Sequence, residues 1–539
     1  MLNVLAQTAA LLAATANPDS LSGRLSPAPS SQSMSIAASD AAVEVRVTPP
    51  DDEGGRRRFK LGRAGLQIAG AMGLGVGWYE SQIELNKLDF DFDRTFSDQT
   101  RRLFTTDGYR FDDNNRVLNV GHAFMGAYYH QLARQNGGGM AEALLFDFVT
   151  SSTWELTVEH REVISLNDTV TTSLGGVAVG ESLYQIGDFF ARSRPTVTNR
   201  ILMGLFSPAH AAGLLWGDRP EPTSAGFDQR GFARDAYHRF ALGLGAARAV
   251  GGEQAEPAAW DGDLRFDLEL VNLASYGKEA VRSRVLGGGE FTRINVDYRG
   301  SREDLRALTT SARASLWGSY RQRTTSNSAS GSPGEGLRGH ALFLGSATAF
   351  DLIVDQMGDT EDFITALHLI GPAADLTVHR DRLSLRLATD VLPDFAMVRP
   401  FALDPARGSD QLVGQKSTVR HHAYYYALGV TTTARAEAQY RKLRAGGGLS
   451  YSYHDSIEGL DRHQTDYVSP TGVFHPAISD DAEAVDQRLT LRLFGDSGLP
   501  ATDMRLGVSL DYRQRTGTMS QTTREQDDLR FSLLASYAL

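Results

Sequence analysis

Four ionisable side chains in one part of the chain have the types and spacing needed for acid–base or metal chemistry. They are His122, Glu155, Glu159 and Asp168. Glu155 and Glu159 are four residues apart, so on a helix both carboxylates lie on one face. Like charges at this spacing cost about 0.2–0.5 kcal/mol unless a cation or a proton lies between them. We therefore take these four residues as candidate catalytic residues.

Nearby polar residues could complete a binding site. The candidate ligand-binding residues are Tyr129, Arg134, Asn167 and Glu181. Carboxylates and histidines on facing helices form the metal sites of helical bundles, and a His–carboxylate pair without a metal can act as a general base. A structural alternative stays open and is favoured: His122 fastens a helix end, Asp168 caps a helix, and the glutamates pair with arginines. The sequence identifies no particular metal or cofactor.

The elements that carry these residues have a helical period, from about residue 60 to residue 216. Asn119 can cap the first clear helix, and the turn that contains Ser165 and Asp168 can cap the third. Glycines in that third helix, including Gly176 and Gly180, would let a neighbouring helix approach closely. The predicted helices cover residues 119–135, 140–160, 169–191 and 196–216, the last interrupted near Pro208. Residues 64–79 could be a close-packed helix or a first strand.

After about residue 230 the apolar period changes to two. In the stretch 264–270, four apolar residues share one face, while Arg265, Asp267 and Glu269 share the other. Twelve such stretches are predicted as strands: 237–246, 264–270, 292–298, 312–320, 337–350, 376–378, 383–387, 424–438, 449–453, 489–493, 506–512 and 529–539.

A period of two fits a soluble sandwich or a barrel whose apolar face meets lipid. Segment length and the Tyr and Trp residues near segment ends favour the membrane. The final stretch, 529–539, alternates without a break and resembles the closing strand of bacterial outer-membrane barrels. That resemblance implies recognition by the barrel assembly machinery, although such strands usually end in Phe and this chain ends in Leu539. Inward arginines would line a polar interior: Arg313, Arg386, Arg492 and Arg530.

Composition excludes several other classes of protein. The net charge of -11 and the pI near 5.7 argue against a nucleic-acid partner. The chain has no cysteine, so packing and hydrogen bonds must hold it without disulfides. A mean hydropathy of -0.27 is too polar for an inner-membrane bundle of helices but suits a barrel with a wet lumen.

The N-terminal residues have the features of an export signal. An apolar stretch is followed by the small-x-small pattern of Ala14, Thr15 and Ala16, so we predict a signal peptide over residues 1–16. Residues 17–58 are rich in Ser, Ala, Pro and Asp without periodicity and are predicted to be a disordered linker. The remaining predicted domains are a helical domain, 59–216, and an outer-membrane barrel, 230–539.

The helical half also carries a set of motifs typical of one bacterial family. The motifs are Asn-x-x-His in NVGHAFMGAYYHQLARQNG, Trp-Glu-x-x-x-Glu in SSTWELTVEH, Ser-x-Asn-Asp with Gly-x-x-x-Gly-Glu in SLNDTVTTSLGGVAVGE, and the run LYQIGDFFAR. Over about residues 85–200 the chain resembles the uncharacterised bacterial envelope family called domain of unknown function 3943. The family usually has Pro after the His, where this chain has Ala123. The resemblance implies export to a Gram-negative cell envelope and no established activity.

We therefore predict an α+β protein: an N-terminal helical bundle followed by an antiparallel transmembrane β-barrel of about twelve strands. It would lie in the outer membrane, in contact with outer-membrane lipids, with its helices as a plug in the lumen or as a periplasmic domain. A structural or transport role in the envelope is the first functional hypothesis. The alternative is an enzyme that modifies or hydrolyses envelope lipid or glycan through the His and carboxylate residues of the helices.

Overall fold

The computed structural model describes most of the chain after residue 57. The described residues are 58–86, 92, 94–111, 116–218, 220–251, 260–301, 305–326, 336–357, 360–402, 424–457, 483–500, 502–519 and 522–538. The predicted signal peptide and all but the last residue of the predicted linker lie outside these ranges.

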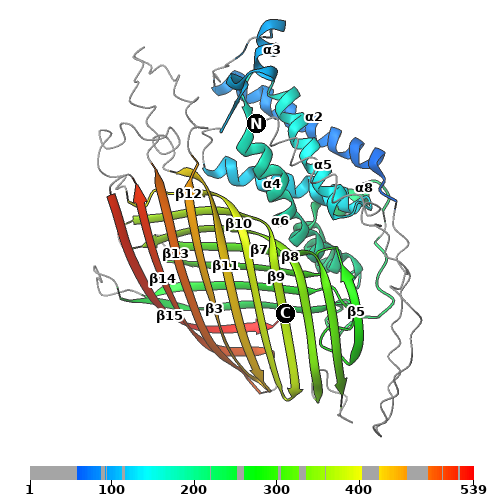
Figure 1. Cartoon of the computed structure of the whole chain (residues 1–539). Helices are drawn as coiled ribbons and strands as arrows, with labels where there is room; N and C mark the ends of the chain where they lie inside the picture. Colours follow the sequence, from blue (N-terminus) through cyan, green and yellow to red (C-terminus); the bar gives the residue numbers. More distant parts are fainter. Residues whose placement is uncertain are drawn as a thin grey trace, which may run out of the picture. The chain divides into compact units, whose positions relative to one another are not determined.

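Seven α-helices occupy the first part of the described chain (Figure 1). They are α2 (Leu61–Asn86), α3 (Phe96–Phe104), α4 (Arg116–Gln135), α5 (Met140–Thr153), α6 (Leu166–Arg192), α7 (Val197–Phe206) and α8 (Pro208–Leu215). A π-helical turn, Trp154–Val158, continues α5, and the short strands β1 (Tyr109–Arg110) and β2 (Ile164–Ser165) pair in parallel. No described helix is long and apolar enough to cross a membrane by itself.

The helices begin and end close to where the sequence predicts. Ser165 caps α6, because its side-chain oxygen accepts the backbone N–H of Asp168 at 3.2 Å. Pro208 stands at the start of α8, which explains the predicted interruption. Residues 64–79, for which the sequence allowed either a helix or a strand, are helical. The helix α3 was not predicted.

Glycines let α4 and α6 pack with their backbones almost in contact. A Cβ added to Gly126 would collide with the carbonyl oxygen of Thr172 and would lie 3.1 Å from the Cα of Gly176. A Cβ on Gly180 would lie 2.9 Å from the Cα of Ala127. The predicted role of the α6 glycines is therefore confirmed.

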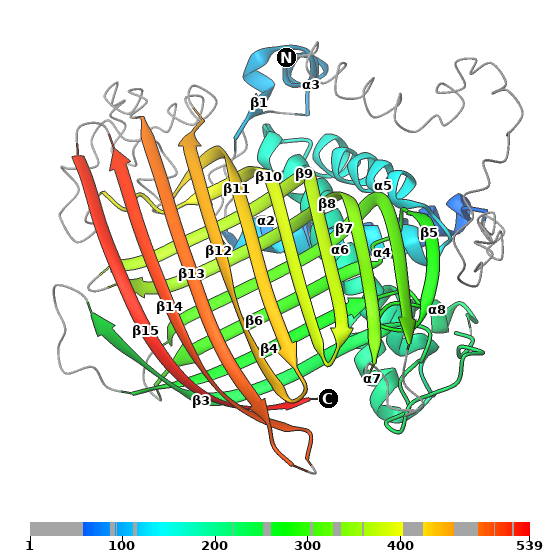
Figure 2. The same ribbon diagram turned by 60° about the horizontal axis from the view of Figure 1, so that its bottom comes forward.

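Twelve strands of the described chain form a closed antiparallel ring. The strands are β3 (Tyr237–Gly251), β4 (Asp261–Val271), β6 (Phe291–Gly300), β7 (Leu305–Ser326), β8 (Leu337–Met357), β9 (Thr360–Asp381), β10 (Leu383–Val398), β11 (Tyr425–Tyr440), β12 (Leu443–Ser456), β13 (Ala484–Gly498), β14 (Met504–Met519) and β15 (Thr522–Ala538). Neighbours in this order pair with each other, and the pairing of β15 with β3 closes the ring. Figure 2 shows the two walls crossing, as expected for tilted strands. The predicted barrel and its strand count are confirmed.

The strand β5 (Ala280–Leu286) was not among the predicted strands. It pairs with residues 318–324 of β7, while β6 pairs with residues 305–314 on the same edge. Thus β5 and β6 act as one strand position interrupted by the glycines 287–289.

The two faces of the barrel wall are opposite in chemistry. On β4, Arg265 and Glu269 pair with residues of β14 and β10 across the ring, so they point into the lumen. Phe266 and Leu268 between them point outward, and many outward side chains on strands that no helix covers are apolar and exposed. Examples are Leu244, Leu387, Leu428, Leu449, Leu493, Val508 and Leu533. This arrangement is that of a transmembrane barrel, with an apolar belt outside and charge inside.

The helices pack against the outward face of one part of the barrel wall. The C-terminal half of α6 shares a core with outward side chains of β3, β4, β6 and β7: Phe189, Phe190, Phe240, Leu268, Leu270, Ile294 and Ala312. Farther along, Val179 of α6 packs with Phe350 and Leu367 of β8 and β9. Figures 1 and 2 both show α6 beside β7 and β8. The helices therefore contact the outside of the barrel wall, whereas the predicted plug would contact the lumen.

Candidate functional site

The eight predicted site residues fall into three separate groups. The first group joins α4 to the start of α6. His122 Nδ1 lies 2.8 Å from Asp168 Oδ1, with His122 a quarter exposed and Asp168 buried. The side-chain amide of Asn167 donates to Asp168 Oδ1 at 2.9 Å and to the hydroxyl of Tyr426 at 2.8 Å. Asn119 donates to the hydroxyl of Tyr424 at 3.0 Å.

This first group fastens the helices to the barrel wall. Tyr424 lies just before β11 and Tyr426 within it, and both are buried on the outward face, where Phe111 stacks on Tyr426 at 5.2 Å. Buried polar groups need hydrogen-bond partners, and Asn119 and Asn167 supply them to the tyrosines. The predicted pair of His122 and Asp168 thus exists, within a network that reaches from α4 to the barrel.

Glu155 and Glu159 form the second group, and they do not share a site. The π-helical turn changes the spacing between them, and each has its own partner. Glu155 Oε2 accepts the backbone N–H of Ser165 at 3.0 Å, at the start of α6. Glu159 Oε1 accepts the indole N–H of Trp154 at 2.8 Å. The buried guanidinium of Arg102 donates to the backbone carbonyls of both residues, at 2.5 and 3.0 Å.

The third group is a fully buried ionic cluster between α4, α5 and α6. His130 is its centre: Nδ1 lies 3.0 Å from Asp147 Oδ2 and Nε2 lies 2.9 Å from Glu181 Oε2. Arg134 donates to both oxygens of Glu181, at 2.9 and 3.1 Å. Neither His130, Asp147 nor Glu181 exposes any side-chain surface. Tyr129 packs in the adjoining apolar cluster, and burial raises its pKa to about 12.

The pKa values of this cluster follow from burial opposed by ion pairing. Burial lowers the pKa of His130, but Asp147 and Glu181 outweigh it and raise that pKa to about 9. Burial raises the pKa of Glu181, but Arg134 and His130 outweigh it and lower that pKa to about 2. Burial raises the pKa of Asp147 to about 7, although His130 opposes the shift. At neutral pH His130 is therefore an imidazolium held between two acidic side chains.

The same cluster reaches the barrel at the break between β5 and β6. Gln185 donates to Glu181 Oε1 at 2.7 Å and also to the carbonyl oxygen of Gly288. Gly289 has a φ of +75°, and a Cβ there would lie 2.7 Å from Glu181 Cγ. Glu181 therefore connects two helices to one position of the barrel wall.

Two members of this cluster, His130 and Asp147, were not among the predicted site residues. A signal for each was present in the sequence. Asp147 is the one acid in the middle of the apolar run MAEALLFDFV, and His130 lies four residues before Arg134. A charge on an apolar helix face needs a buried partner, so this pair could have been predicted.

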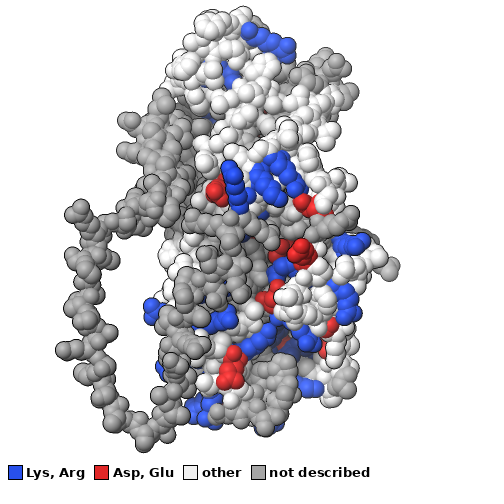
Figure 3. Space-filling view, turned by 90° about the vertical axis from the view of Figure 1, so that its right-hand side faces the viewer, with Lys and Arg blue, Asp and Glu red and all other residues white. Residues whose placement is uncertain are grey.

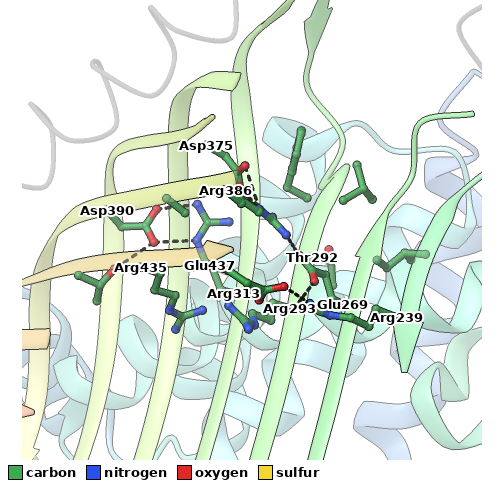
Figure 4. Close-up of a pocket in the computed structure, with 15 residues that line it drawn as sticks. Arg239, Glu269, Thr292, Arg293, Arg313, Asp375, Arg386, Asp390, Arg435 and Glu437 are labelled. Atoms are coloured by element: carbon green, nitrogen blue, oxygen red, sulfur yellow. Dashed lines mark hydrogen bonds and ion pairs between the residues drawn. The ribbon is translucent and has the colours of Figure 1, made fainter. Parts of the chain in front are cut away.

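The lumen holds a second and larger set of charges (Figure 4). Arg386 pairs with Asp375 at 2.6 Å and also with Glu269, and Arg239 pairs with Glu437 at 2.6 Å. Arg313 pairs with Asp390 at 2.6 Å, Arg492 with Asp297 at 2.6 Å and Arg530 with Asp355 at 3.0 Å. The four arginines predicted to point inward thus all have carboxylate partners.

These ion pairs leave little space between the residues that form them. The cavity between Arg239, Glu269, Arg313 and Arg386 is about 50 Å³. A wider vestibule of about 1070 Å³ lies at the end where tight turns join β9 to β10 and β11 to β12, and its lining includes Arg382. No group of three or more His, Asp or Glu side chains in the described ranges is placed to hold a metal ion.

Comparison with known proteins identifies the helical part. Residues 108–209 match the family model described as Domain of unknown function (DUF3943). This match confirms the family resemblance for the segment that contains all three groups of predicted residues. A search of curated proteins found no match.

The solved structures similar to the chain include several outer-membrane proteins. OmpT, an outer membrane protein of Vibrio cholerae, is 7% identical over 57% of this chain and 98% of its own, with a TM-score of 0.21. The NanC porin is 8% identical over 55% of this chain and 100% of its own, with a TM-score of 0.22. The translocator domain of the autotransporter NalP from Neisseria meningitidis is 10% identical over 61% and 96%, with a TM-score of 0.19. The barrel assignment rests on the chain's own strand ring and apolar belt.

Proposed function

We propose that the protein is a structural component of the outer membrane, a barrel with a closed lumen that carries the DUF3943 helices on its wall. The observation that carries this proposal is the set of ion pairs that cross the lumen. Outer-membrane lipids would surround the exposed part of the apolar belt, and the closing strand would be the segment recognised by the barrel assembly machinery.

At the width of this barrel, the ion pairs decide whether the lumen is open or closed. Side chains alone fill an eight-stranded barrel, and barrels of about 16–18 strands leave an aqueous channel. A twelve-stranded ring lies between these limits, so the length of the inward side chains decides whether it is open. Arg239, Arg313 and Arg386 are long enough to meet carboxylates from other strands, and the cavity that they line measures about 50 Å³.

A transport role would require this constriction to open. Removing one partner of a buried ion pair typically costs about 3–5 kcal/mol, because the other charge is left without compensation. Several such pairs would have to separate together, which favours a structural role. The vestibule at the tight-turn end is the feature that a transport role would use, since it is open and lined by basic residues.

The enzymatic alternative has one supporting contact, between His122 and Asp168. Asp168 also accepts from Asn167, which is itself bound to the barrel tyrosine Tyr426. A general base needs a free approach to its substrate, whereas this pair sits within a network of fixed partners. The enzyme hypothesis stays a prediction, and the structural proposal is favoured.

Conductance across a planar lipid bilayer tests the closed lumen. We expect the folded wild-type protein to give no steady current, and the double variant Arg239→Ala with Arg386→Ala to give one, because two cross-lumen side chains are removed. The control is Arg382→Ala, which removes an exposed arginine at the rim of the vestibule. Steady wild-type conductance equal to that of the double variant would refute the closed lumen and favour transport.

A further inference from the structure

The exposed side of the helical layer is apolar. We use helical layer for α2 and α4 to α8, of which α6 makes most of the contacts with the barrel wall. Large apolar side chains on α4 and α5 are 40–82% exposed: Val117, Phe124, Met125, Leu145, Phe148 and Val149. Leu66 and Leu74 extend this surface onto α2, with exposed fractions of 65% and 80%. A patch across three helices is larger than the scattered apolar residues of an ordinary protein surface.

Charge is missing from the same surface. Among the described residues of α4 and α5, Glu142 is the one exposed charged side chain, and it accepts the backbone N–H of Gly139 at 2.7 Å. The ionic residues His130 and Asp147 point into the layer instead. A helix that faces water carries its charges outside and its apolar residues inside, so α4 and α5 have the reverse arrangement. In Figure 3 the upper part of the face is mostly white, with a few blue side chains at its top and a group of blue and red side chains below it.

This apolar surface is continuous with the outer belt of the barrel. Phe124, which is 48% exposed, meets the outward Phe350 of β8 edge to face, with ring centroids 6.4 Å apart. On the strands beyond the helices, outward residues such as Leu387 and Leu428 are 55% and 54% exposed. Where the helices cover the strands, their own exposed apolar side chains therefore continue the apolar belt.

We propose that the exposed face of α4 and α5, with the adjoining face of α2, contacts the acyl chains of the membrane that surrounds the barrel. The helical layer is then immersed beside the barrel, and its buried ionic cluster is shielded from lipid by its own outer residues. This inference rests on the proposed membrane placement of the barrel.

The chemistry of the surface favours lipid over a protein partner. A protein interface carries a polar rim and about one hydrogen bond per 100–200 Å². The exposed polar groups on α5 are already satisfied within the chain: the Thr153 hydroxyl donates to the carbonyl oxygen of Val149 at 2.7 Å, and Glu142 caps its own helix. A helix face whose polar groups are bonded within the chain suits hydrocarbon, which offers no hydrogen-bond partners.

Single cysteines can report what touches this surface, because the natural chain contains no cysteine. The test uses full-length protein in liposomes, with Met125→Cys and Leu145→Cys carrying a nitroxide label. The lipid control is Leu493→Cys on β13, and the water control is Glu221→Cys after α8. Folding of each variant is checked by its heat-modifiable mobility in gel electrophoresis.

We expect both helix labels to match the Leu493 control, with high collision rates for oxygen and low rates for a water-soluble nickel complex. High nickel accessibility would overturn the inference and place the face in water. Low accessibility to both reagents would also overturn it, because it would mean that a second copy of the chain or another protein covers this face. If the Leu493 label itself were accessible to nickel, the membrane placement of the barrel would fail, so the two failures are distinguishable.

Discussion

At the scale of single residues, the buried cluster around His130 shows how the helices accommodate charge in an apolar layer. An isolated buried ion is unfavourable by several kcal/mol, so each charge must meet an opposite one. Glu181 satisfies this condition for two cations at once, since it accepts from Arg134 and lies 2.9 Å from His130. Removing its charge should therefore have a larger effect than removing any exposed charge.

We predict that Glu181→Gln lowers the local unfolding free energy of α4 and α6 by about 3 kcal/mol, because Arg134 and His130 lose their shared counter-ion. Hydrogen exchange measured by mass spectrometry on peptides from these helices would detect faster exchange. The matched control is Glu221→Gln at an exposed position, where we expect no change. Equal exchange in the two variants would show that the cluster contributes nothing to stability.

Part of this chemistry could be predicted from sequence, and part could not. Arg134 was expected to pair with Glu155 or Glu159 and pairs with Glu181 instead. The pairing of His122 with Asp168 follows from polar residues on facing helices. The separation of Glu155 from Glu159 does not, because the π-helical turn that separates them has no clear sequence signal. Whether the predicted residues catalyse a reaction or bind a ligand stays a prediction.

At the scale of elements, the closeness of α4 and α6 depends on glycine. We predict that Gly126→Val separates the two helices and costs more than the about 1–3 kcal/mol usual for overpacking, because its side chain would meet backbone atoms of Thr172 and Gly176. The control is Gly121→Val on the same helix, where an added Cβ meets nothing within 4 Å.

The measurement is again hydrogen exchange across α4 and α6, now with urea titration in detergent to compare stabilities. Exchange in α6 should rise for Gly126→Val and stay at the wild-type rate for Gly121→Val. If the two variants behaved alike, the change would reflect the different helix propensities of glycine and valine, and close packing would not be the cause.

Strands were easier to predict than the shorter helical elements. A period of two persists along each wall strand, because its two faces meet different media, and each of the twelve predicted stretches overlaps one strand of the ring. The helix α3 is only nine residues long and its apolar residues are few, so no period could establish it. β5 has two arginines and no inward–outward contrast, which hid it from the same argument.

At the scale of the whole molecule, the contact between helices and barrel could not be predicted. An outward leucine on a strand gives the same sequence pattern whether lipid or a helix covers it. Leu268 is 2% exposed beneath the helices, whereas Leu264 on the same face of β4 is 39% exposed. Only the three-dimensional structure distinguishes these two positions, and with them the part of the wall that α6 covers.

The link between the two parts can be measured at Gly289 and Glu181. Gly289→Ala should destabilise the helical layer for two reasons: its φ of +75° disfavours alanine, and the new Cβ would displace Glu181 from its partners. Glu181→Ala removes the group that would be displaced. In a double-mutant cycle we therefore expect a coupling energy of about 1–3 kcal/mol between the two positions, measured from exchange in α6.

Gly277→Ala is the matched control for backbone strain. Its φ is +69°, but the nearest atom to an added Cβ is 3.8 Å away, on Tyr237, so no helix residue is disturbed. Gly277→Ala and Glu181→Ala should be additive, since their effects share no contact. If Gly289→Ala were additive with Glu181→Ala as well, the ionic cluster of the helices would be independent of the barrel wall. Strong coupling at Gly289 alone would mean that the ionic cluster is one of the contacts through which the helical layer and the barrel stabilise each other.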